Sequence, residues 1–358
     1  MSSTWGNNIK ISIFGESHGE AIGAVLEGIP AGQKINFNYI NHQLSRRRPR
    51  NDGFTTSRQE TDNFKVLSGI FKDYTTGTPI CAIFYNEDAD SSCYKDLIFR
   101  PGHADYTAHV RYQGFEDYRG GGHFSGRLMC PLVFAGSICR QVLEGKGISV
   151  GSHISSVGNI NDKLFDPVKI SKTVLKSLSQ SEFPVIDQEV KSVIERKILS
   201  VKSQGDSIGG TIECAVVGVP AGMGDPIFDN IESKISSIIF GIPAVKGIEF
   251  GRGFESSKIL GSENNDNYIL KEGKICTETN NHGGILGGIS SGMPIIFKVA
   301  FKPTPSIEKK QITIDAKNNS KKILELSGRH DPCIVLRASP IVEAAAAIAI
   351  LDIVIKDV

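Results

Sequence analysis

The sequence has few features of a disulfide-bonded, zinc-binding or membrane protein. Its seven cysteines are an odd number and none forms a C-x-x-C pair, so neither a disulfide framework nor a zinc knuckle is supported. The first residues lack the basic and apolar segments of a signal peptide. The most apolar stretch, Ala344 to Ile355, contains Asp352 and is too short to span a bilayer. We expect a cytoplasmic protein with no metal site and no membrane partner.

The chain also lacks an excess of charge of either sign. Lys and Arg number 40 against 39 Asp and Glu, a formal net charge of +1, so a general attraction to nucleic acid is not expected. Any affinity for anions must come from local clusters. No low-complexity tract or Pro/Ser linker divides the 358 residues, and 40% of them are hydrophobic. We therefore treat residues 1–358 as a single domain with a large core.

Glycine, by contrast, is abundant and scattered. Its 38 residues predict many strands and tight turns rather than a helical bundle. Two stretches do have helical patterns. Residues 184–203 carry apolar side chains at an amphipathic spacing, and the alanine-rich run from Pro340 predicts a buried C-terminal helix. The fold class is mixed, α+β.

One segment occurs twice. Residues 15–32 (GESHGEAIGAVLEGIPAG) align without a gap on residues 205–222 (GDSIGGTIECAVVGVPAG). The identities are mostly glycine, proline and small residues, as a turn–strand–turn scaffold requires, and they predict two pseudo-symmetric halves. His18 is not shared, because Ile208 stands at its counterpart. The repeat therefore assigns the shared glycines and prolines to the scaffold and indicates a chemical role for His18.

Two histidines lie in glycine-containing turns, His18 in GESHG and His103 in RPGHAD. Little side-chain bulk separates each imidazole from a ligand, and histidine exchanges protons near neutral pH. The first turn also matches the G-x-S-x-G nucleophile elbow of serine hydrolases. An elbow needs a helix directly after the serine, whereas residues 20–28 alternate like a strand. A turn with a structural serine is the favoured interpretation, and a serine hydrolase is the alternative.

Arginines form a dense cluster at Arg46, Arg47, Arg48 and Arg50. Guanidinium groups grip carboxylates or phosphates with two hydrogen bonds, so the cluster suits an anionic ligand. A solvated basic loop and a nucleic-acid-binding module remain the alternatives. The loop at residues 119–127 (RGGGHFSGR) has consecutive glycines whose backbone N–H groups can form an anion nest.

Taken in order, these motifs resemble those of the chorismate synthase family over nearly the whole chain. The matching segments are GESHG at 15–19, RRRP at 46–49, RPGHADY at 100–106, RGGGHFSGR at 119–127, GVPAGMGDPIFD at 218–229, GGILGGISSG at 283–292, KPTPSI at 302–307 and GRHDPC at 328–333. The resemblance implies conversion of 5-enolpyruvylshikimate 3-phosphate to chorismate and phosphate. This anti 1,4-elimination needs reduced FMN although no net redox change occurs. A β-α-β sandwich and a homotetramer are implied as well.

The resemblance also implies roles for particular residues. His18 would act beside the leaving phosphate, His103 near the pyrimidine end of the flavin, and Asp331 near flavin N5. Arg46, Arg47 and Arg48 would contact the anionic substrate or NADPH. FMN contacts implied by position are His123, Phe124, Ser125, Pro243, Ala244, Gly287, Lys302, Pro303, Thr304, Pro305, Ser306 and Arg329.

Several positions depart from the more familiar members of the family. His123 and Gly53 stand where arginine is common, Pro243 replaces a frequent asparagine, and His282 stands where a small residue is usual. These changes put individual flavin or NADPH contacts in doubt. None touches His18, His103 or Asp331, so activity is still expected. No reductase-like segment is visible, and we expect the flavin to be reduced by an external reductant.

Overall fold

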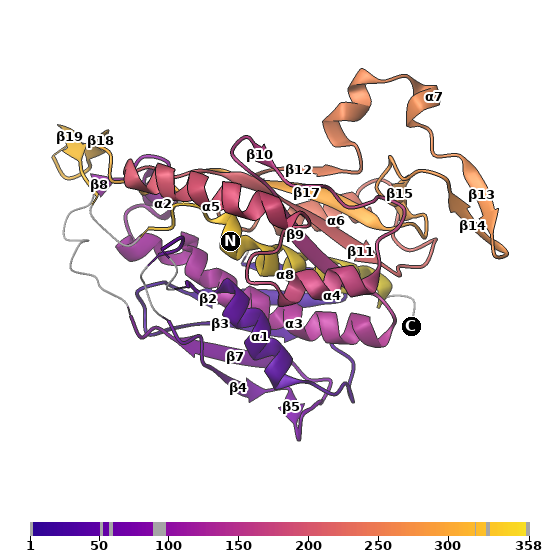
Figure 1. The fold of residues 1–358 in the computed structure, drawn as a ribbon. Coiled ribbons are helices and arrows are strands. Elements are labelled where there is room, and N and C mark those ends of the chain that lie inside the picture. Colours follow the sequence, from indigo (N-terminus) through magenta and orange to yellow (C-terminus); the bar gives the residue numbers. More distant parts are fainter. Residues whose placement is uncertain are drawn as a thin grey trace.

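Two five-stranded antiparallel sheets enclose a layer of helices (Figure 1). The computed structural model describes residues 3–50, 53–56, 60–88, 98–318, 320–326 and 330–355. The first sheet has the order β1 (Thr4–Trp5), β2 (Lys10–Gly15), β3 (Ala21–Glu27), β7 (Ile80–Tyr85) and β4 (Phe64–Ser68). The second has the order β10 (Ile160–Asn161), β9 (Ser149–Val157), β11 (Gly210–Val217), β17 (Ile295–Phe301) and β12 (Val245–Phe250).

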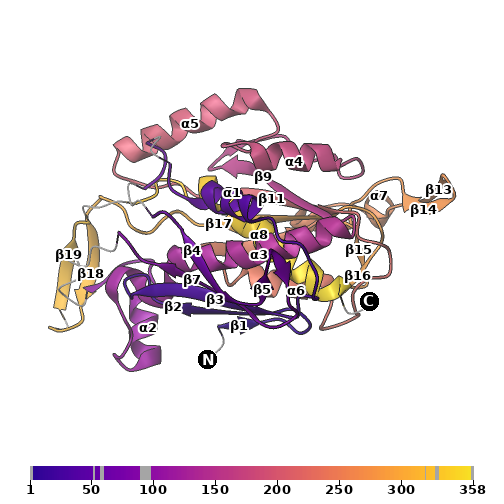
Figure 2. The ribbon, with the colours of Figure 1, turned by 90° about the horizontal axis from the view of Figure 1, so that it is seen from below.

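The helices between the sheets are α1 (Phe37–Arg47), α3 (Met129–Gly145) and α8 (Val335–Val354). Helix α3 packs on the first sheet and α8 on the second, and α6 (Ile231–Ile239) packs against α8 (Figure 2). The two long helices approach closely because Gly136 of α3 has no side chain. A Cβ there would lie 2.3 Å from the Cβ of Ala344. Their contact fills the core, so the predicted β-α-β sandwich is confirmed.

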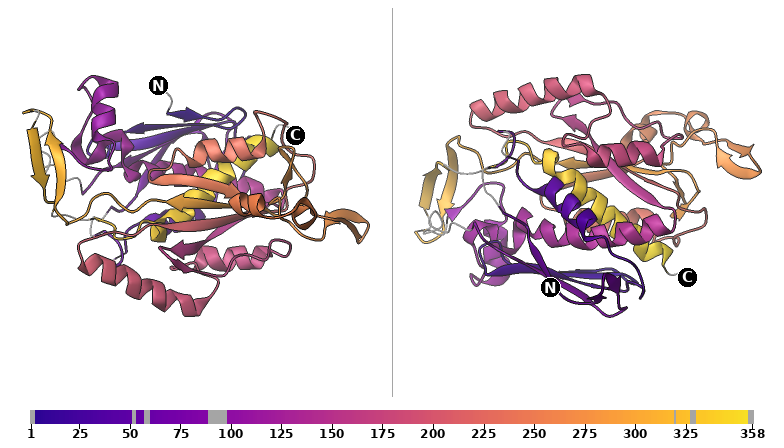
Figure 3. Two further views of the ribbon diagram at one scale, coloured as in Figure 1. Left: turned by 90° about the horizontal axis from the view of Figure 1, so that it is seen from above. Right: turned by 60° about the horizontal axis from the view of Figure 1, so that its bottom comes forward.

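The outer face of the second sheet is covered by α4 (Lys172–Gln180), with α5 (Gln188–Ser203) beside it (Figure 3). Helix α5 begins four residues later than predicted. Asp187 caps it, since its side chain accepts a hydrogen bond from the N–H of Glu189 at 3.0 Å. Helix α8 begins five residues earlier than predicted and contains Pro340. No helix among the described residues is long and apolar enough to cross a membrane.

Smaller elements form the edges and projections. They are the hairpins β5 (Ile70–Phe71) with β6 (Tyr74–Thr75), β13 (Tyr268–Lys271) with β14 (Lys274–Thr277), and β15 (Ile285–Leu286) with β16 (Ile289–Ser290). A three-stranded sheet joins β8 (Ile98–Phe99), β18 (Gln311–Asp315) and β19 (Ser320–Leu324). Short helices are α2 (Asp105–Tyr112), α7 (Gly261–Asn264), and 3₁₀ segments at Arg119–Phe124, Gly126–Leu128 and Gly253–Lys258. The β13–β14 and β18–β19 hairpins project at opposite ends (Figure 1).

The repeated segments occupy equivalent positions in the two sheets. Strand β3 and strand β11 are each third in their sheet. The turns after them make the same hydrogen bonds. Gly32 N–H donates to the carbonyl of Thr75, whose hydroxyl donates to Pro30; Gly222 N–H donates to Ser290, whose hydroxyl donates to Pro220. The two halves thus share a backbone pattern even where their sequences differ.

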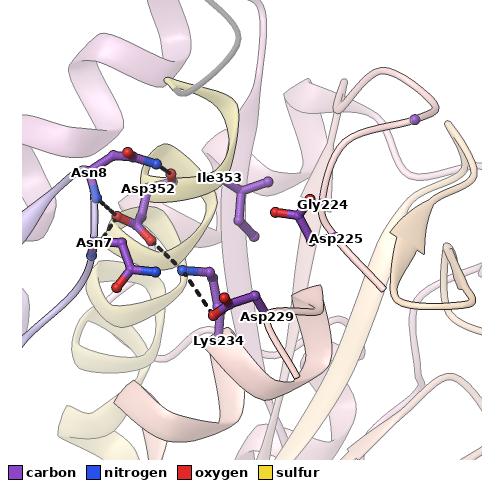
Figure 4. Close-up of a pocket in the computed structure, with 9 residues that line it drawn as sticks. Asn7, Asn8, Gly224, Asp225, Asp229, Lys234, Asp352 and Ile353 are labelled. Carbon is purple, nitrogen blue, oxygen red and sulfur yellow. Dashed lines mark hydrogen bonds and ion pairs between the residues drawn. The ribbon is translucent and has the colours of Figure 1, made fainter. Parts of the chain in front are cut away.

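The far end of α8 is held by one buried carboxylate (Figure 4). Asp352 accepts hydrogen bonds from the backbone N–H groups of Asn7, Asn8 and Ile9 and from the ammonium of Lys234 at 2.8 Å. Asn7, Asn8, Lys234 and Asp352 are among the residues that line a polar cavity of about 190 Å³. Since 17 residues of helix span about 25 Å, this cavity is remote from residues at the start of α8.

A buried histidine joins β9 to β11. His153 is fully buried, with Nδ1 3.0 Å from Oδ2 of Asp162 and Nε2 2.8 Å from Oε2 of Glu213. Burial opposes its charge, but the two carboxylates raise its pKa above the usual value. Burial likewise opposes the Asp162 charge, yet the bond from His153 and two backbone N–H groups lower the pKa of that carboxyl. The imidazolium therefore holds two carboxylates in the core.

Replacing His153 with alanine is expected to destabilise the fold by about 3–5 kcal/mol, because two carboxylates are left facing each other without a cation. Thermal unfolding at pH 6 measures this effect. The contact of His153 with Asp162 and Glu213 contributes fully to the free energy of unfolding below the unfolded histidine pKa of about 6.5. This contribution falls as pH rises through the raised pKa of His153 in the folded protein. It is also lost in acid as Asp162 is protonated. An unchanged Tm in the variant would contradict this role.

Candidate active site

The first histidine turn joins β2 to β3. Ser17 is fully buried, and its Oγ lies 3.1 Å from Nδ1 of His18 and 3.4 Å from the carbonyl oxygen of Arg119. Its backbone N–H donates to the carbonyl of Gly122 at 3.2 Å. A strand follows the serine where a hydrolase elbow requires a helix. The serine therefore supports the turn and the imidazole, as the strand-like pattern after it predicted.

The glycine-rich loop lies directly against this turn. Gly120, Gly121 and Gly122 all have positive φ, and the ring of His18 occupies the place where a side chain of Gly120 would begin. Beside it, hydrogen bonds from Arg119 hold the pKa of Asp117 below its usual value, and the charge of His18 adds to the effect. The loop thus brings the backbone of Gly120 against the imidazole.

His123 uses both ring nitrogens within the protein. Nδ1 lies 2.9 Å from the carbonyl oxygen of Gly15, and Nε2 lies 2.9 Å from Oγ of Ser3. A ring that donates to Gly15 and accepts from Ser3 satisfies both contacts in its neutral form. Phe124 packs near Tyr112 with ring centroids 6.2 Å apart, and Ser125 Oγ accepts a hydrogen bond from the Arg127 N–H. The side chain of His123 therefore ties the glycine loop to β2.

The second histidine turn meets the predicted flavin segment at residues 302–306. Nε2 of His103 lies 2.8 Å from Oγ of Ser306, and the ammonium of Lys302 donates to the carbonyl of Gly102 at 2.6 Å. The Lys302 N–H donates to the carbonyl of Ala244, a residue with φ +72°. Three distant segments, two of them at the end of β17 and the start of β12, thus converge at His103.

This second turn is electrostatically unfavourable for a charged imidazole. Burial, followed by the charge of Arg100, lowers the pKa of His103 to about 4. Burial and the nearby Lys246 also lower the pKa of Lys302. His103 is therefore neutral at pH 7 and exchanges a hydrogen bond with Ser306 rather than carrying charge.

Arg100 connects the second histidine turn to the glycine loop, although the sequence did not single out this side chain. Its guanidinium makes two 2.8 Å hydrogen bonds to Asp105. Burial would raise the pKa of Asp105, but the bonds and charge of Arg100 lower it. The same guanidinium lies beside Gly121, where an added Cβ would be 3.9 Å from Nη2. The sequence could have pointed to Arg100, because it lies in the RPGHAD segment three residues before His103.

Asp331 is fixed immediately before α8. Its Oδ1 accepts from the Thr56 N–H at 3.0 Å and its Oδ2 accepts from Nη1 of Arg337 at 2.6 Å. Arg337 also donates to the carbonyl of Arg47 at 2.8 Å. Asp331 and Ser306 line a cavity of about 130 Å³, together with Thr55, Lys202, Gly205, Asp206, Ile307, Glu308, His330 and Pro332. Ser306 thus links this carboxylate to the His103 turn.

The predicted arginine cluster is largely turned inward. Asp62, whose side chain is fully buried, pairs with Arg47 and Arg127, and lies 3.6 Å from Nε of Arg48. Arg46 instead makes a two-pronged contact with the buried Glu343. Of the three predicted ligands, Arg48 is the most exposed, at 31% of its side chain. Arg46 and Arg47 therefore support the site from within the core.

Among the other predicted flavin residues, Gly287 lies apart from the His103 turn. Gly287 is in the β15–β16 hairpin, beside the start of β17, whereas Lys302 follows its end, and a strand of that length spans about 20 Å. One chain thus does not bring Gly287 to the other residues. Arg329 lies outside the described residues. Pro243 precedes Ala244 near Lys302 but offers no N–H.

Two of the departures noted in the sequence have structural roles. The carbonyl of Gly53 accepts a hydrogen bond from Lys202 at 2.6 Å. His282 places Nδ1 2.6 Å from Asp266 in a turn before the β15–β16 hairpin. Neither contact involves the two histidine turns. The Gly53 contact holds Lys202, which lines the Asp331 cavity, whereas the His282 contact lies near the β15–β16 hairpin.

Comparison with known proteins agrees with the resemblance seen in the motifs. The family model described as chorismate synthase matches residues 9–355. A chorismate synthase of Pyrococcus abyssi is 45% identical over 97% of this chain and 96% of its own length. One of Dehalococcoides mccartyi is 42% identical over 99% and 97%. A crystal structure of chorismate synthase covers 99% of this chain and 93% of its own, with a TM-score of 0.78 and 29% identity. The chain therefore belongs to the chorismate synthase family.

Proposed function

We propose that the two histidine turns and Asp331 form one active site, with His18 at the leaving phosphate and His103 and Asp331 beside reduced FMN. The chain is a chorismate synthase, a carbon–oxygen lyase of the shikimate pathway. Its reaction removes phosphate from 5-enolpyruvylshikimate 3-phosphate to give chorismate. The observation that carries the proposal is a series of neighbours between the two turns. His18 lies against Gly120, and the next residue, Gly121, lies beside Arg100, whose carbonyl accepts a hydrogen bond from the His103 N–H. Ser306 contacts His103 and lines a cavity with Asp331.

The residues around His103 fit a flavin. Oγ1 of Thr304 is buried and has no hydrogen-bond partner among the described residues, so this segment has polar capacity left for a ligand. The ammonium of Lys302, the guanidinium of Arg100 and the glycine loop supply donors for a phosphate or a ring carbonyl. We propose that residues 302–306, Ala244 and the loop at 123–125 hold FMN, whose reduced ring supplies the electron density that C–O cleavage needs.

The chain's own groups then have separable tasks. His18 holds a proton or positive charge at the phosphate as its bond to carbon breaks. Neutral His103 fixes a hydrogen-bonding pattern without adding charge. The carboxylate of Asp331, oriented by Arg337 and by the Thr56 N–H, would lie near flavin N5 and help the flavin take up the proton that leaves the substrate carbon. Arg48 provides a cation at the arginine cluster for a substrate carboxylate or for NADPH.

The proposal also covers the source of reduced FMN and the oligomeric state of the protein. We propose that an external reductant supplies reduced FMN, with NADPH as a candidate, and that the protein is a homotetramer like the family. Nuclear magnetic resonance of the product tests the reaction. Anaerobic incubation with reduced FMN should give one chorismate per phosphate, whereas phosphate accompanied by any other product would contradict the proposal.

The role of His103 predicts a pH effect. In the protein without flavin, the His103 imidazole should stay neutral from pH 8 to about 5 and titrate near its lowered pKa of about 4. Replacement with alanine should change the pH at which the absorbance of bound reduced FMN changes. The titration is followed by the Cε1–H resonance of labelled histidine. A midpoint near 6.5, or an unaltered flavin titration in the variant, would contradict the role.

A further inference from the structure

The imidazole of His18 lies on bare backbone. A Cβ built on Gly120 would be 1.8 Å from Cε1 and 2.1 Å from Nδ1 of His18, well inside any permitted contact. The same Nδ1 is 3.1 Å from Oγ of Ser17. The ring thus contacts a serine hydroxyl and lies against the backbone of Gly120, and the space for it exists because residue 120 has no side chain.

The three glycines of the loop have distinct constraints. A Cβ on Gly122 would be 2.1 Å from the carbonyl oxygen of Asp117, so Gly122 is needed by the loop itself. A Cβ on Gly121 would meet atoms no nearer than 3.9 Å, although its φ of +89° is as unfavourable for a side chain as the +60° of Gly120. Gly120 alone of the three would collide with His18. Positive φ is therefore common to all three glycines, whereas the contact with the His18 ring is made by Gly120 alone.

We propose that Gly120 is a positioning residue for His18, and that its absent side chain sets where the imidazole lies relative to the substrate. The inference rests on the proposed role of His18. A ring displaced by a methyl group at 120 loses the Ser17 contact and moves by more than an ångström. A misplacement of that size costs about 10²-fold in rate when the group must meet a reacting atom.

The test uses four full-length proteins, namely wild type, Gly120→Ala, His18→Ala and the double variant. We expect Gly120→Ala to lower kcat by about 10²-fold with KM within about threefold. In the His18→Ala background the same change should alter the rate by less than threefold, since the ring it displaces is absent. An equal loss in both backgrounds would overturn the proposal, because the loop would then act on a ligand directly.

A second readout does not depend on activity. In protein labelled at histidine Cε1, the resonance missing from His18→Ala identifies His18. It should shift in Gly120→Ala and stay unchanged in the control Gly121→Ala, which has a comparable backbone strain without the collision. An unmoved resonance in Gly120→Ala would overturn the proposal.

The same set of variants distinguishes the other failures. If Gly120→Ala unfolds at a lower temperature, the double variant should recover most of the loss, whereas an equal loss in the double variant would count against a collision with His18. If His18→Ala releases phosphate at the wild-type rate, the proposed role of His18 fails. The resonance shift would still report whether Gly120 positions the ring.

Discussion

Replacing His18 with alanine is expected to slow phosphate release by about 10²- to 10⁴-fold, the usual contribution of a positioned acid or base. The imidazole meets the glycine loop and the Ser17 hydroxyl, so it is held where a phosphate bound by that loop would leave. FMN affinity should be close to that of the wild type, since the proposed FMN residues 302–306 lie at the second histidine turn, beside His103. Phosphate release with reduced FMN and a flavin titration measure the two effects.

The control is His42→Ala, which removes an exposed histidine of α1 whose Nε2 contacts the carbonyl of Ser179. It should leave phosphate release unchanged. A His18→Ala enzyme that retains at least a third of the wild-type rate would contradict the assignment of His18 to the leaving group. A serine hydrolase would instead lose activity completely on replacement of Ser17 and only in part on replacement of His18.

Replacing Asp62 with alanine should damage both stability and activity. The carboxylate is buried between Arg47 and Arg127. Its loss takes the counterion from Arg47 and leaves Arg127 with Glu60 alone, at 3.7 Å, at a cost of about 3–5 kcal/mol. Arg47 also accepts a bond from Arg337, which holds Asp331. A shift of Arg47 therefore reaches the Asp331 carboxylate, which is proposed to act near flavin N5. Thermal unfolding and kcat measure the two losses.

The effect of pH on this cluster has a definite sign. Burial would raise the pKa of Asp62, but Arg47 and Arg127 lower it below the usual value of an aspartate. Its stabilising contribution is present above the unfolded pKa of about 3.9 and is lost as pH falls through the folded value.

The control for Asp62→Ala is Asp229→Ala, which removes an exposed carboxylate 3.9 Å from Lys234. Equal Tm values for wild type and Asp62→Ala at pH 7 would contradict the account.

The features predicted best from the sequence are those encoded locally. The glycines and prolines of the repeat specify turns through their own backbone preferences, and the strand after Ser17 follows from alternation over a few residues. The C-terminal helix follows from a long apolar run, although its start was placed five residues late. Helix α5 starts at the cap Asp187, whereas the amphipathic spacing placed its start at residue 184.

The features that could not be predicted depend on pairs distant in the chain. Asp62 and Arg127 are 65 residues apart, and Arg46 and Glu343 are 297 apart, with no local pattern to mark either pair. Clustered arginines indicated an anion, but the anions nearest to Arg46 and Arg47 are the protein's own carboxylates. The contact of Gly120 with His18 could not be predicted from the sequence either, because the glycines of both segments are already explained by their turns.

The most direct test of the central claim is the dependence of phosphate release on the redox state of FMN. Purified protein is mixed anaerobically with 5-enolpyruvylshikimate 3-phosphate and with reduced FMN, oxidised FMN or no flavin. The account predicts release of one phosphate per chorismate with reduced FMN alone, and loss of that release in His18→Ala. Phosphate release at a similar rate without flavin, or with oxidised FMN, would contradict it.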